Sequence, residues 1–248
     1  MNIYVYSSGQ DFYMKMASLG CVSHKRANPT AKVFLLTTDE YIDEQYLSML
    51  SNEGITVHNF HKIKKELSYI ASDGDNVRFH TFARWECFLR VIYQYTQSNE
   101  TYALLDPDII SIRKWDDIQE RLMNGEIAFT RQFDWDNFIN GGFIVGHFTD
   151  MSRIGNYLMD RIKNDISRGA FVRSPYDQIY WNRYYHDFGI KELCLGSDFI
   201  RLSFQRELFN SKLVHQIDFK GFLFEYPIIN QIAYEYNIPI TEFDLAKY

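Results

Sequence analysis

The sequence has little cysteine and proline, and it has no long apolar run. Its 248 residues include three cysteines, Cys21, Cys87 and Cys194, which are widely spaced and form no CxxC pair. This pattern indicates buried thiols in a reducing compartment, with no functional cysteine chemistry. No stretch approaches the roughly 20 apolar residues of a membrane span, and the N-terminus lacks the features of a secretion signal. These absences predict a cytoplasmic protein without a transmembrane segment.

Several functional signatures are also missing. Acidic residues outnumber basic ones, 32 to 26, and the net charge of −6 argues against a nucleic-acid partner. The chain contains no G-x-x-x-x-G-K-[ST], G-x-G-x-x-G or G-x-S-x-G motif, so P-loop hydrolysis, dinucleotide binding and a serine nucleophile are not supported. The seven histidines show no HxxxH spacing, which disfavours a zinc site.

Apolar and aromatic residues are plentiful by contrast. Hydrophobic residues make up 46% of the chain and aromatic residues 17%, which suffices for a large core. Strands are expected at Ile3–Tyr6, Lys32–Thr37 and Ile55–Phe60, with helices from about Phe12 and over Asp43–Ser51. This alternation predicts a single α/β domain over residues 1–248, with a doubly wound, mostly parallel central sheet and flanking helices.

The middle of the chain continues the pattern. An amphipathic helix is expected over Arg78–Tyr95, with an apolar stripe and three arginines off that stripe, Arg78, Arg84 and Arg90. Further strands are expected at Tyr102–Leu105, Glu126–Phe129 and Phe138–Val145, and helices near Asp116–Met123 and Met151–Ile166. The C-terminal third reads only as a mixed region.

The segment with the clearest chemistry is Tyr102 to Ile110, in which an apolar strand runs into Asp106-Pro107-Asp108. Residues two apart on a strand project to the same side, so both carboxylates can face one point. Pro107 cannot donate a ladder hydrogen bond, so the strand should end there or lie at a sheet margin. Ligands bind at the carboxyl ends of strands in open α/β sheets, and two carboxylates favour Mg²⁺ or Mn²⁺. The alternative is a surface turn that happens to contain two acids.

Four motifs occur in an order that is characteristic of one enzyme class. The arginine-bearing helix leads into the Asp106-Pro107-Asp108 strand, and Asn140-Gly141-Gly142 follows within an apolar segment. Asp177-Gln178 precedes Asn182, and His215 precedes Lys220-Gly221. Together these segments resemble the GT-A-fold glycosyltransferases, and glycosyltransferase family 8 most of all. The resemblance spans most of the chain.

The resemblance implies a role for each matching residue. Asp106, Asp108 and His215 would hold Mn²⁺ or Mg²⁺, while Asp177, Gln178 and Asn140 would be catalytic or flank the reacting sugar. The nucleotide-sugar donor would contact Ser7, Ser8, Arg84 (with Arg78 as the alternative), Asp106, Gly141 and Lys220. Residues 1–110 would form the nucleotide-binding half and residues 111–248 the acceptor-binding half. The C-terminal motif departs from the family pattern, because His215 and Lys220 are separated by a different spacing.

Each of these residues also has a structural interpretation. Arg84 could lie on a solvated helix face, Asp177 could cap a helix after Ser174-Pro175, and Asn140-Gly141-Gly142 could be a plain bulge. His215 could be an ordinary strand histidine.

The implied activity is metal-dependent transfer of a sugar, from a UDP-sugar before a GDP-sugar, to a glycan or other hydroxyl acceptor. Family 8 enzymes retain anomeric configuration, which favours retention, whereas inversion would need a base such as Asp134, Asp136 or Asp177. A sugar-nucleotide nucleotidyltransferase, a catalytically idle sugar- or protein-binding domain and a metal-dependent nuclease are the alternatives. Residues 7–10 lack the glycine-rich basic loop of the first, and the acidic balance disfavours the last.

Overall fold

The fold is described from a computed structural model of the chain. The structure describes residues 1–7, 11–71, 74–94, 100–131, 139–170, 176–195, 199–202, 211–215 and 226–240.

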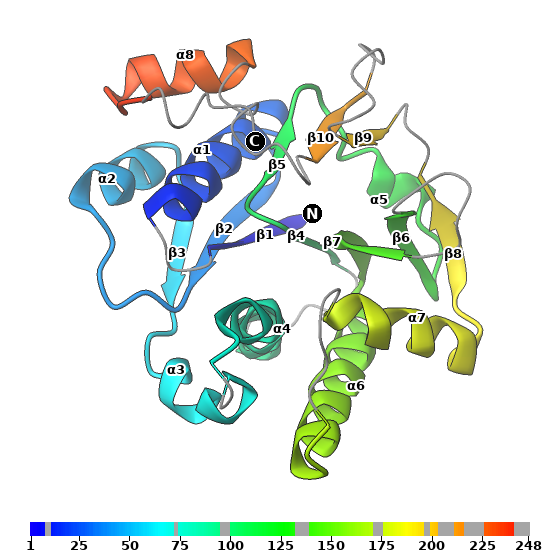
Figure 1. Cartoon of the computed structure of the whole chain (residues 1–248). Coiled ribbons are helices and arrows are strands. Elements are labelled where there is room, and N and C mark those ends of the chain that lie inside the picture. The colour runs from blue at the N-terminus through cyan, green and yellow to red at the C-terminus, as the bar shows by residue number, and fades with distance from the viewer. Residues whose placement is uncertain are drawn as a thin grey trace.

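The described residues build a seven-stranded sheet in the order β3-β2-β1-β4-β7-β6-β8 (Figure 1). Neighbouring strands are parallel from β3 to β4, and β8 is parallel to β6, whereas β7 runs antiparallel to both β4 and β6. The strands are β1 (Asn2–Ser7), β2 (Lys32–Thr37), β3 (Thr56–Asn59), β4 (Thr101–Leu105), β6 (Glu126–Arg131), β7 (Ile139–His147) and β8 (Lys191–Cys194). The predicted mostly parallel central sheet is therefore confirmed.

A smaller sheet of three strands lies beside the large one, in the order β5-β10-β9. It consists of β5 (Ile109–Ser111), β10 (Leu213–His215) and β9 (Ile200–Leu202). β10 pairs antiparallel with β5, and this register sets His215 opposite Ile109. A strand from the C-terminal region thus lies next to the segment that follows Asp106-Pro107-Asp108.

Helices cover both faces of the large sheet (Figure 1). One face carries α1 (Asp11–Ala27), α2 (Glu44–Asn52) and α8 (Pro227–Glu235), and the other carries α4 (Asn76–Gln94), α6 (Phe148–Ser167) and α7 (Asp177–Phe188). Three short helical segments are α3 (Ile63–Glu66), η1 (Ser68–Ala71) and α5 (Ile118–Arg121). Most predicted elements agree with these bounds, but the helix expected over Asp116–Met123 is only one turn long.

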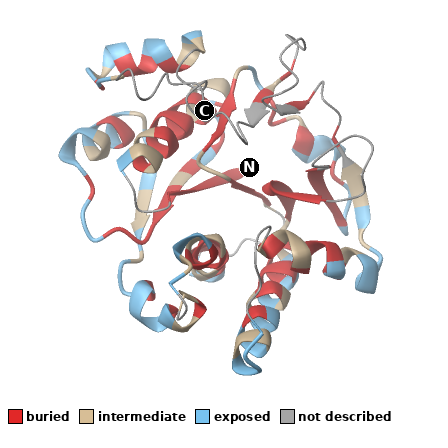
Figure 2. Ribbon diagram, viewed as in Figure 1, coloured by how far each residue is buried: buried red, intermediate tan, exposed pale blue. Residues whose placement is uncertain are grey.

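The two faces of the sheet have different cores, and alternation along the strands produces the difference. On β1, Ile3 and Val5 point to the α1 face, whereas Tyr4 and Tyr6 point to the α4 face. The α1 face is packed mainly with aliphatic side chains, and the α4 face is rich in rings such as Phe82, Phe88 and Trp181. Figure 2 shows the central strands of the sheet buried, whereas the edge strands β3 and β8 are intermediate or exposed, as are the outer sides of the helices.

Helix α4 is buried around most of its circumference, which a single apolar stripe did not predict. Phe79, Phe82, Trp85 and Phe88 are all buried, and so are two of the arginines that fall off the stripe, Arg78 and Arg84. The interpretation of Arg84 as part of a solvated face is therefore wrong. Arg90 does lie partly in solvent, with its side chain 37% exposed.

Among the described residues, no helix combines the length and the apolar character that crossing a membrane would require.

Candidate functional site

A cavity of about 810 Å³ opens at the carboxyl ends of β1 and β4, where α4, β7 and α7 meet. Six of the predicted site positions lie in its wall: Arg84, Asp106, Asp108, Gly141, Asp177 and Gln178. The remaining lining residues are Tyr6, Tyr13, Lys64, Ser68, Ala71, Asn76, Val77, Phe79, His80, Thr81, Pro107, Gly142 and Tyr176. The structure thus gathers residues from five separate segments of the sequence at one place.

Asp106 and Asp108 lie on a tight turn between β4 and β5. The strand ends at Leu105, as the proline predicts, and the backbone N–H of Ile109 donates to the carbonyl oxygen of Asp106 at 3.2 Å. The two acids are therefore brought to one cavity by a β-turn, and not by the alternation of a strand as predicted. The N–H of Asp106 donates to the carbonyl of Gly142 at 2.8 Å, which ties the turn to β7.

Arg84 connects both groups of acids. Its Nη1 pairs with Asp106 Oδ1, and its Nη2 donates to Asp177 Oδ2 at 2.7 Å and to the carbonyl of Gly141 at 3.0 Å. The indole Nε1 of Trp85 donates to the same oxygen of Asp177 at 2.9 Å. The side chains of Arg84 and Asp177 are each 5% exposed, whereas that of Asp106 is 32% exposed. Arg84 therefore forms a buried ion pair with Asp177 and a more accessible one with Asp106.

Burial and the neighbouring charges act in opposite directions on the pKa values of Arg84 and Asp177. Burial would lower the pKa of Arg84, but the charges of Asp106 and Asp177 outweigh burial and raise that pKa above its usual value. Burial also raises the pKa of Asp177, although the positive charge of Arg84 and the hydrogen bond from Trp85 oppose the rise. Arg84 thus stays charged and stabilises a carboxylate that would otherwise favour its protonated form.

The Asn140-Gly141-Gly142 segment forms a bulge at the edge of the cavity. Phe129 of β6 pairs with Ile144 of β7, and the next residue of β6 pairs with Asn140, so three residues of β7 stand between the two pairs. Gly141 and Gly142 line the cavity, whereas Asn140 does not; its Oδ1 accepts a hydrogen bond from the N–H of Gly142 at 2.8 Å. Asn140 thereby shapes the bulge that presents the two glycines.

Gly141 is placed where a side chain would not fit easily. A Cβ atom there would lie 3.3 Å from Cγ of Gln178 and 3.4 Å from both carboxylate oxygens of Asp177. The absence of a side chain lets β7 approach the start of α7 closely.

Asp177 is the first residue of α7, and Tyr176 precedes the helix, so Asp177 is not the N-cap that the sequence suggested. Its carboxylate faces Arg84 and Trp85 instead. Asn182, one turn further along, accepts a hydrogen bond from the N–H of Ile139 at 3.1 Å and donates to the carbonyl of Gln178 at 2.7 Å. It joins α7 to the start of β7.

Of the other predicted donor-binding residues, Ser7 is fully buried and does not line the cavity. Arg78 is also buried away from it, with its Nε donating to the carbonyl of Ile70 at 2.7 Å. Ser8, Lys220, Asp134 and Asp136 lie outside the described residues. Only the backbone of His215 is described, and its register with Ile109 sets it one residue from Asp108 in the paired strand.

Tyr6 and His80 are among the lining residues that were not predicted from the sequence. Tyr6 at the end of β1 shares a hydrogen bond of 3.0 Å with Nδ1 of His80 and one of 3.2 Å with Thr38. Burial lowers the pKa of His80 to about 4, aided by the charge of Lys64. His80 precedes Arg84 by one helical turn, a spacing that the sequence alone could have pointed out.

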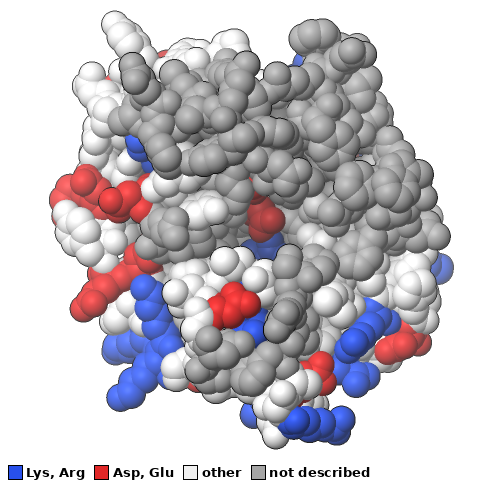
Figure 3. All heavy atoms as spheres, viewed as in Figure 1, with Lys and Arg blue, Asp and Glu red and all other residues white. Residues whose placement is uncertain are grey.

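Lys64 also lines the cavity, and its Nζ lies 3.7 Å from Oδ1 of Asp39. On the face drawn in Figure 3, basic side chains gather at the lower left, over α3. Helix α3 carries the exposed residues Lys64 and Lys65, and exposed Lys62 immediately precedes the helix.

No group of three or more His, Cys, Asp or Glu side chains within the described ranges is arranged to hold a metal ion without further ligands. Asp106 and Asp108 supply two carboxylates to the same cavity. Carboxylate oxygens suit a hard divalent cation that completes its shell with water or phosphate oxygens. Asp106 and Asp108 therefore suit Mg²⁺ or Mn²⁺ as two of the ligands of a site that a bound molecule completes.

The fold is similar to that of the galactosyltransferase LgtC, whose crystal structure is a complex with donor and acceptor sugar analogues. The superposition has a TM-score of 0.62 and covers 98% of this chain and 99% of that one, with 14% sequence identity. The sequence matches no protein-family model and no curated protein sequence. The comparison confirms the predicted GT-A type of fold, while the assignment to glycosyltransferase family 8 stays a prediction.

Proposed function

We propose that the chain is a metal-dependent glycosyltransferase that moves a sugar from a nucleoside-diphosphate donor to a hydroxyl of a glycan or other acceptor. The observation that carries this proposal is the meeting of Asp106, Asp108, Arg84 and Asp177 in one cavity at the carboxyl end of β4. This is the edge of an open α/β sheet at which ligands bind. The similarity of the fold to LgtC, with its sugar-analogue complex, supports the same class of reaction.

The charges at this end of the cavity suit the proposed donor. Three carboxylates and one guanidinium line it, so the balance is negative and attracts a divalent cation. Asp106 and Asp108 would hold Mn²⁺ or Mg²⁺, with His215 as a third ligand. When bound, the cation supplies Lewis-acid neutralisation of charge on the departing nucleoside diphosphate.

The residues of the chain itself orient the sugar. The buried carboxylate of Asp177, held by Arg84 and Trp85, places a fixed negative charge beside the close approach of Gly141. A fixed negative charge stabilises the cation-like character that develops at an anomeric carbon. Gln178 adds an amide: its Oε1 is buried and has no hydrogen-bond partner among the described residues, so it is available to a sugar hydroxyl.

The two halves of the chain would bind different substrates. Residues 1–110 would bind the nucleotide through Ser8 and the Asp106–Asp108 turn, with Lys220 reaching the diphosphate. Residues 111–248 would form the acceptor side, with Asn140 maintaining the bulge between the two. A UDP-sugar is the favoured donor and retention the favoured outcome, and both follow from the likeness to family 8.

The test is calorimetric titration with UDP and with GDP, in Mn²⁺ and in EDTA, on wild type and Asp108→Asn. We expect one nucleotide to bind in Mn²⁺ only, and the variant to lose that binding. Turnover of the matching sugar nucleotide should fall by roughly 100-fold or more, the equivalent of several kcal/mol. Asp160→Asn removes an exposed carboxylate of α6 and serves as the matched control. If folded wild type binds neither nucleotide in Mn²⁺, the transferase proposal is wrong.

A further inference from the structure

Helix α1 passes directly behind the turn that carries Asp106 and Asp108. The closest approach is at Gly20, where a Cβ atom would lie 3.2 Å from the carbonyl oxygen of Ile109 and 3.7 Å from that of Pro107. Gly20 is itself buried in the interior of the helix. The helix therefore meets the backbone of the turn without an intervening side chain.

A buried polar network continues this contact along β5. Ser23 accepts a hydrogen bond from the N–H of Ser111 at 3.1 Å, and its hydroxyl donates to the carbonyl of Gly20 at 2.7 Å. Nδ1 of His24 lies 2.7 Å from Oγ of Ser111, which also accepts from Nε1 of Trp115 at 2.7 Å. One face of α1 thus holds both the backbone and the side chain of Ser111, three residues after Asp108.

The network ends at Asn28, just beyond the helix. Its Oδ1 accepts from the N–H groups of Trp115 and Asp116 at 2.9 and 3.0 Å, and its Nδ2 donates to the carbonyl of His24 at 3.0 Å. The chain is therefore fixed to α1 from the aspartate turn to the end of the following loop.

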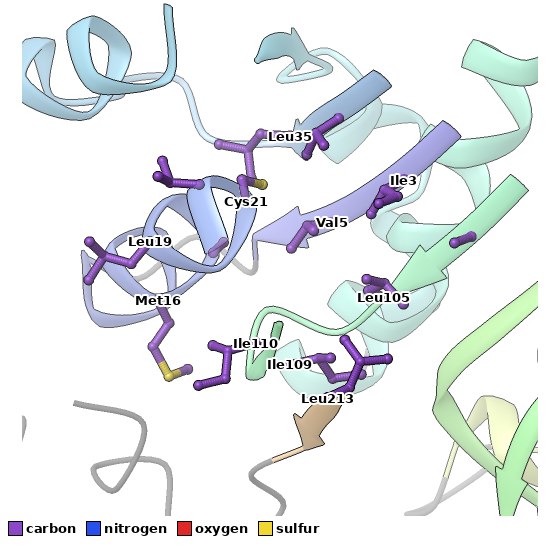
Figure 4. Packing of buried hydrophobic residues seen from close by; sticks show 14 of the residues in the cluster. Ile3, Val5, Met16, Leu19, Cys21, Leu35, Leu105, Ile109, Ile110 and Leu213 are labelled. Carbon is purple, nitrogen blue, oxygen red and sulfur yellow. The ribbon is translucent and has the colours of Figure 1, made fainter. Parts of the chain in front are cut away.

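These polar contacts lie in a region that is otherwise aliphatic. Figure 4 shows Ile109 and Ile110 between α1, with Met16 and Leu19, and Leu213 of β10. Apolar side chains alone would hold β5 against α1 without fixing its register, because such packing is not directional. Hydrogen bonds are directional, so this network favours a single arrangement.

We infer that Gly20 and Ser23 are positioning residues for the cation, because they set the place of the Asp106–Asp108 turn from behind the cavity. Neither residue lines the cavity, so neither touches a ligand there. This inference rests on the proposed function. It extends to β10, whose pairing with β5 transmits the same alignment to the backbone of His215.

Two glycine variants distinguish an effect on the position of the aspartate turn from an effect on the stability of the protein. Gly20→Ala adds a methyl group against the Ile109 carbonyl, whereas Gly155→Ala, the matched control on α6, adds one against the side chain of Leu89 at 2.8 Å. Alanine is intrinsically the better helix former. We expect Gly20→Ala to raise the Kd for Mn²⁺ about tenfold, at the lower end of the effects of outer-shell changes, and to lower the melting temperature no more than Gly155→Ala does. Gly155→Ala should leave that Kd unchanged.

A serine pair tests the hydrogen bonds. Ser23 and Ser152 each donate to the carbonyl three residues earlier in their helix, but Ser23 alone of the two also accepts from Ser111. Ser23→Ala should raise the Kd for Mn²⁺ about tenfold and speed hydrogen exchange at the Ser111 amide. Ser152→Ala should do neither. Binding of Mn²⁺ alone is measured by electron paramagnetic resonance, so the readout does not depend on turnover.

The outcomes separate the inference from the function on which it rests. If wild type binds Mn²⁺ and both α1 variants bind it as tightly as their α6 controls, α1 does not position the turn. If folded wild type binds no Mn²⁺, either alone or with UDP or GDP present, both the inference and the metal-dependent function are wrong. If Ser23→Ala fails to fold, Gly20→Ala still decides the question, because its added methyl group does not remove a hydrogen bond.

Discussion

The Asp106–Asp108 turn lies between two buried polar networks of opposite character. On the α4 side the network is ionic: Arg84 joins Asp106 to Asp177, and all three line the cavity. On the α1 side Ser23, His24, Ser111 and Trp115 are joined by neutral hydrogen bonds, and none of them lines the cavity.

The contrast shows what burial permits in each place. A buried charge needs a partner of opposite sign, and a ligand can exploit the field that such a pair leaves at a cavity wall. Neutral groups are less costly to bury when they are hydrogen-bonded, so they serve to fix a backbone. We therefore expect substitutions on the α4 side to change both the free energy of unfolding and ligand binding. Substitutions on the α1 side should change ligand binding through the position of the turn.

The largest effect should come from removing the charge of Arg84. Arg84→Met leaves the carboxylate of Asp177 buried without its ion-pair partner, so we expect a loss of about 3–5 kcal/mol in the free energy of unfolding. Arg90→Met is the control on the same helix: Arg90 also pairs with two carboxylates, Glu66 and Glu86, but is partly solvated, so its loss should cost less than about 1 kcal/mol. Urea titration measures both.

A double variant identifies the cause of that loss. Arg84→Met combined with Asp177→Asn removes the stranded charge and retains an oxygen for the indole N–H of Trp85. It should therefore be more stable than Arg84→Met alone. If the double variant is no more stable, the loss comes from packing around Arg84, and the ionic description of this side is wrong.

The next largest effect is a loss of stability at low pH that comes from His24 on the α1 side. Burial lowers the pKa of His24 from 6.5 to about 3, and the Ile109 carbonyl only partly opposes it. Below pH 6.5 the unfolded chain thus binds a proton that the folded chain does not, and stability falls as the pH falls through this window. From His24 alone, the loss should reach about 2 kcal/mol by about pH 5.

Urea titrations at several pH values test this prediction on wild type and His24→Gln. The variant should be less stable than wild type near neutrality, because it disturbs the network with Ser111, but its stability should fall less steeply with acid. Equal slopes would mean that His24 is protonated in the folded chain, and the α1 network would then not be neutral.

The sequence predicted the parts of the site that are local. Asp106, Pro107 and Asp108 follow a continuous apolar run, and such a run has few interpretations other than a buried strand, so the end of β4 was placed correctly. The helix of Arg84 was also found from its apolar residues. Both signals lie within a few turns of the chain.

The missing parts depend on contacts between distant residues. Trp85 and Asp177 are 92 positions apart, and His24 and Ser111 are 87 positions apart, so no local pattern announces either pair. The burial of Arg84 could not be read from α4, because an arginine off the apolar stripe looks the same whether solvent or a carboxylate lies beside it. The antiparallel direction of β7 is likewise decided by pairing and not by its own residues.

The last prediction tests how closely β7 must approach the ionic side. Gly141→Ala places a methyl group 3.3–3.4 Å from Gln178 and Asp177, a contact that a shift of a few tenths of an ångström relieves. We expect less than about 1.5 kcal/mol of destabilisation, but weaker binding of the sugar nucleotide, because Asp177 and Gln178 must move.

Gly146→Ala on the same strand meets the side chain of Met151 at 3.2 Å, away from the cavity, and controls for the strand itself. Calorimetry with the sugar nucleotide should show weaker binding for Gly141→Ala alone. Equal binding by the two variants would mean that the gap between β7 and α7 is not part of the ligand site. The ionic network would then bind the ligand independently of the bulge in β7.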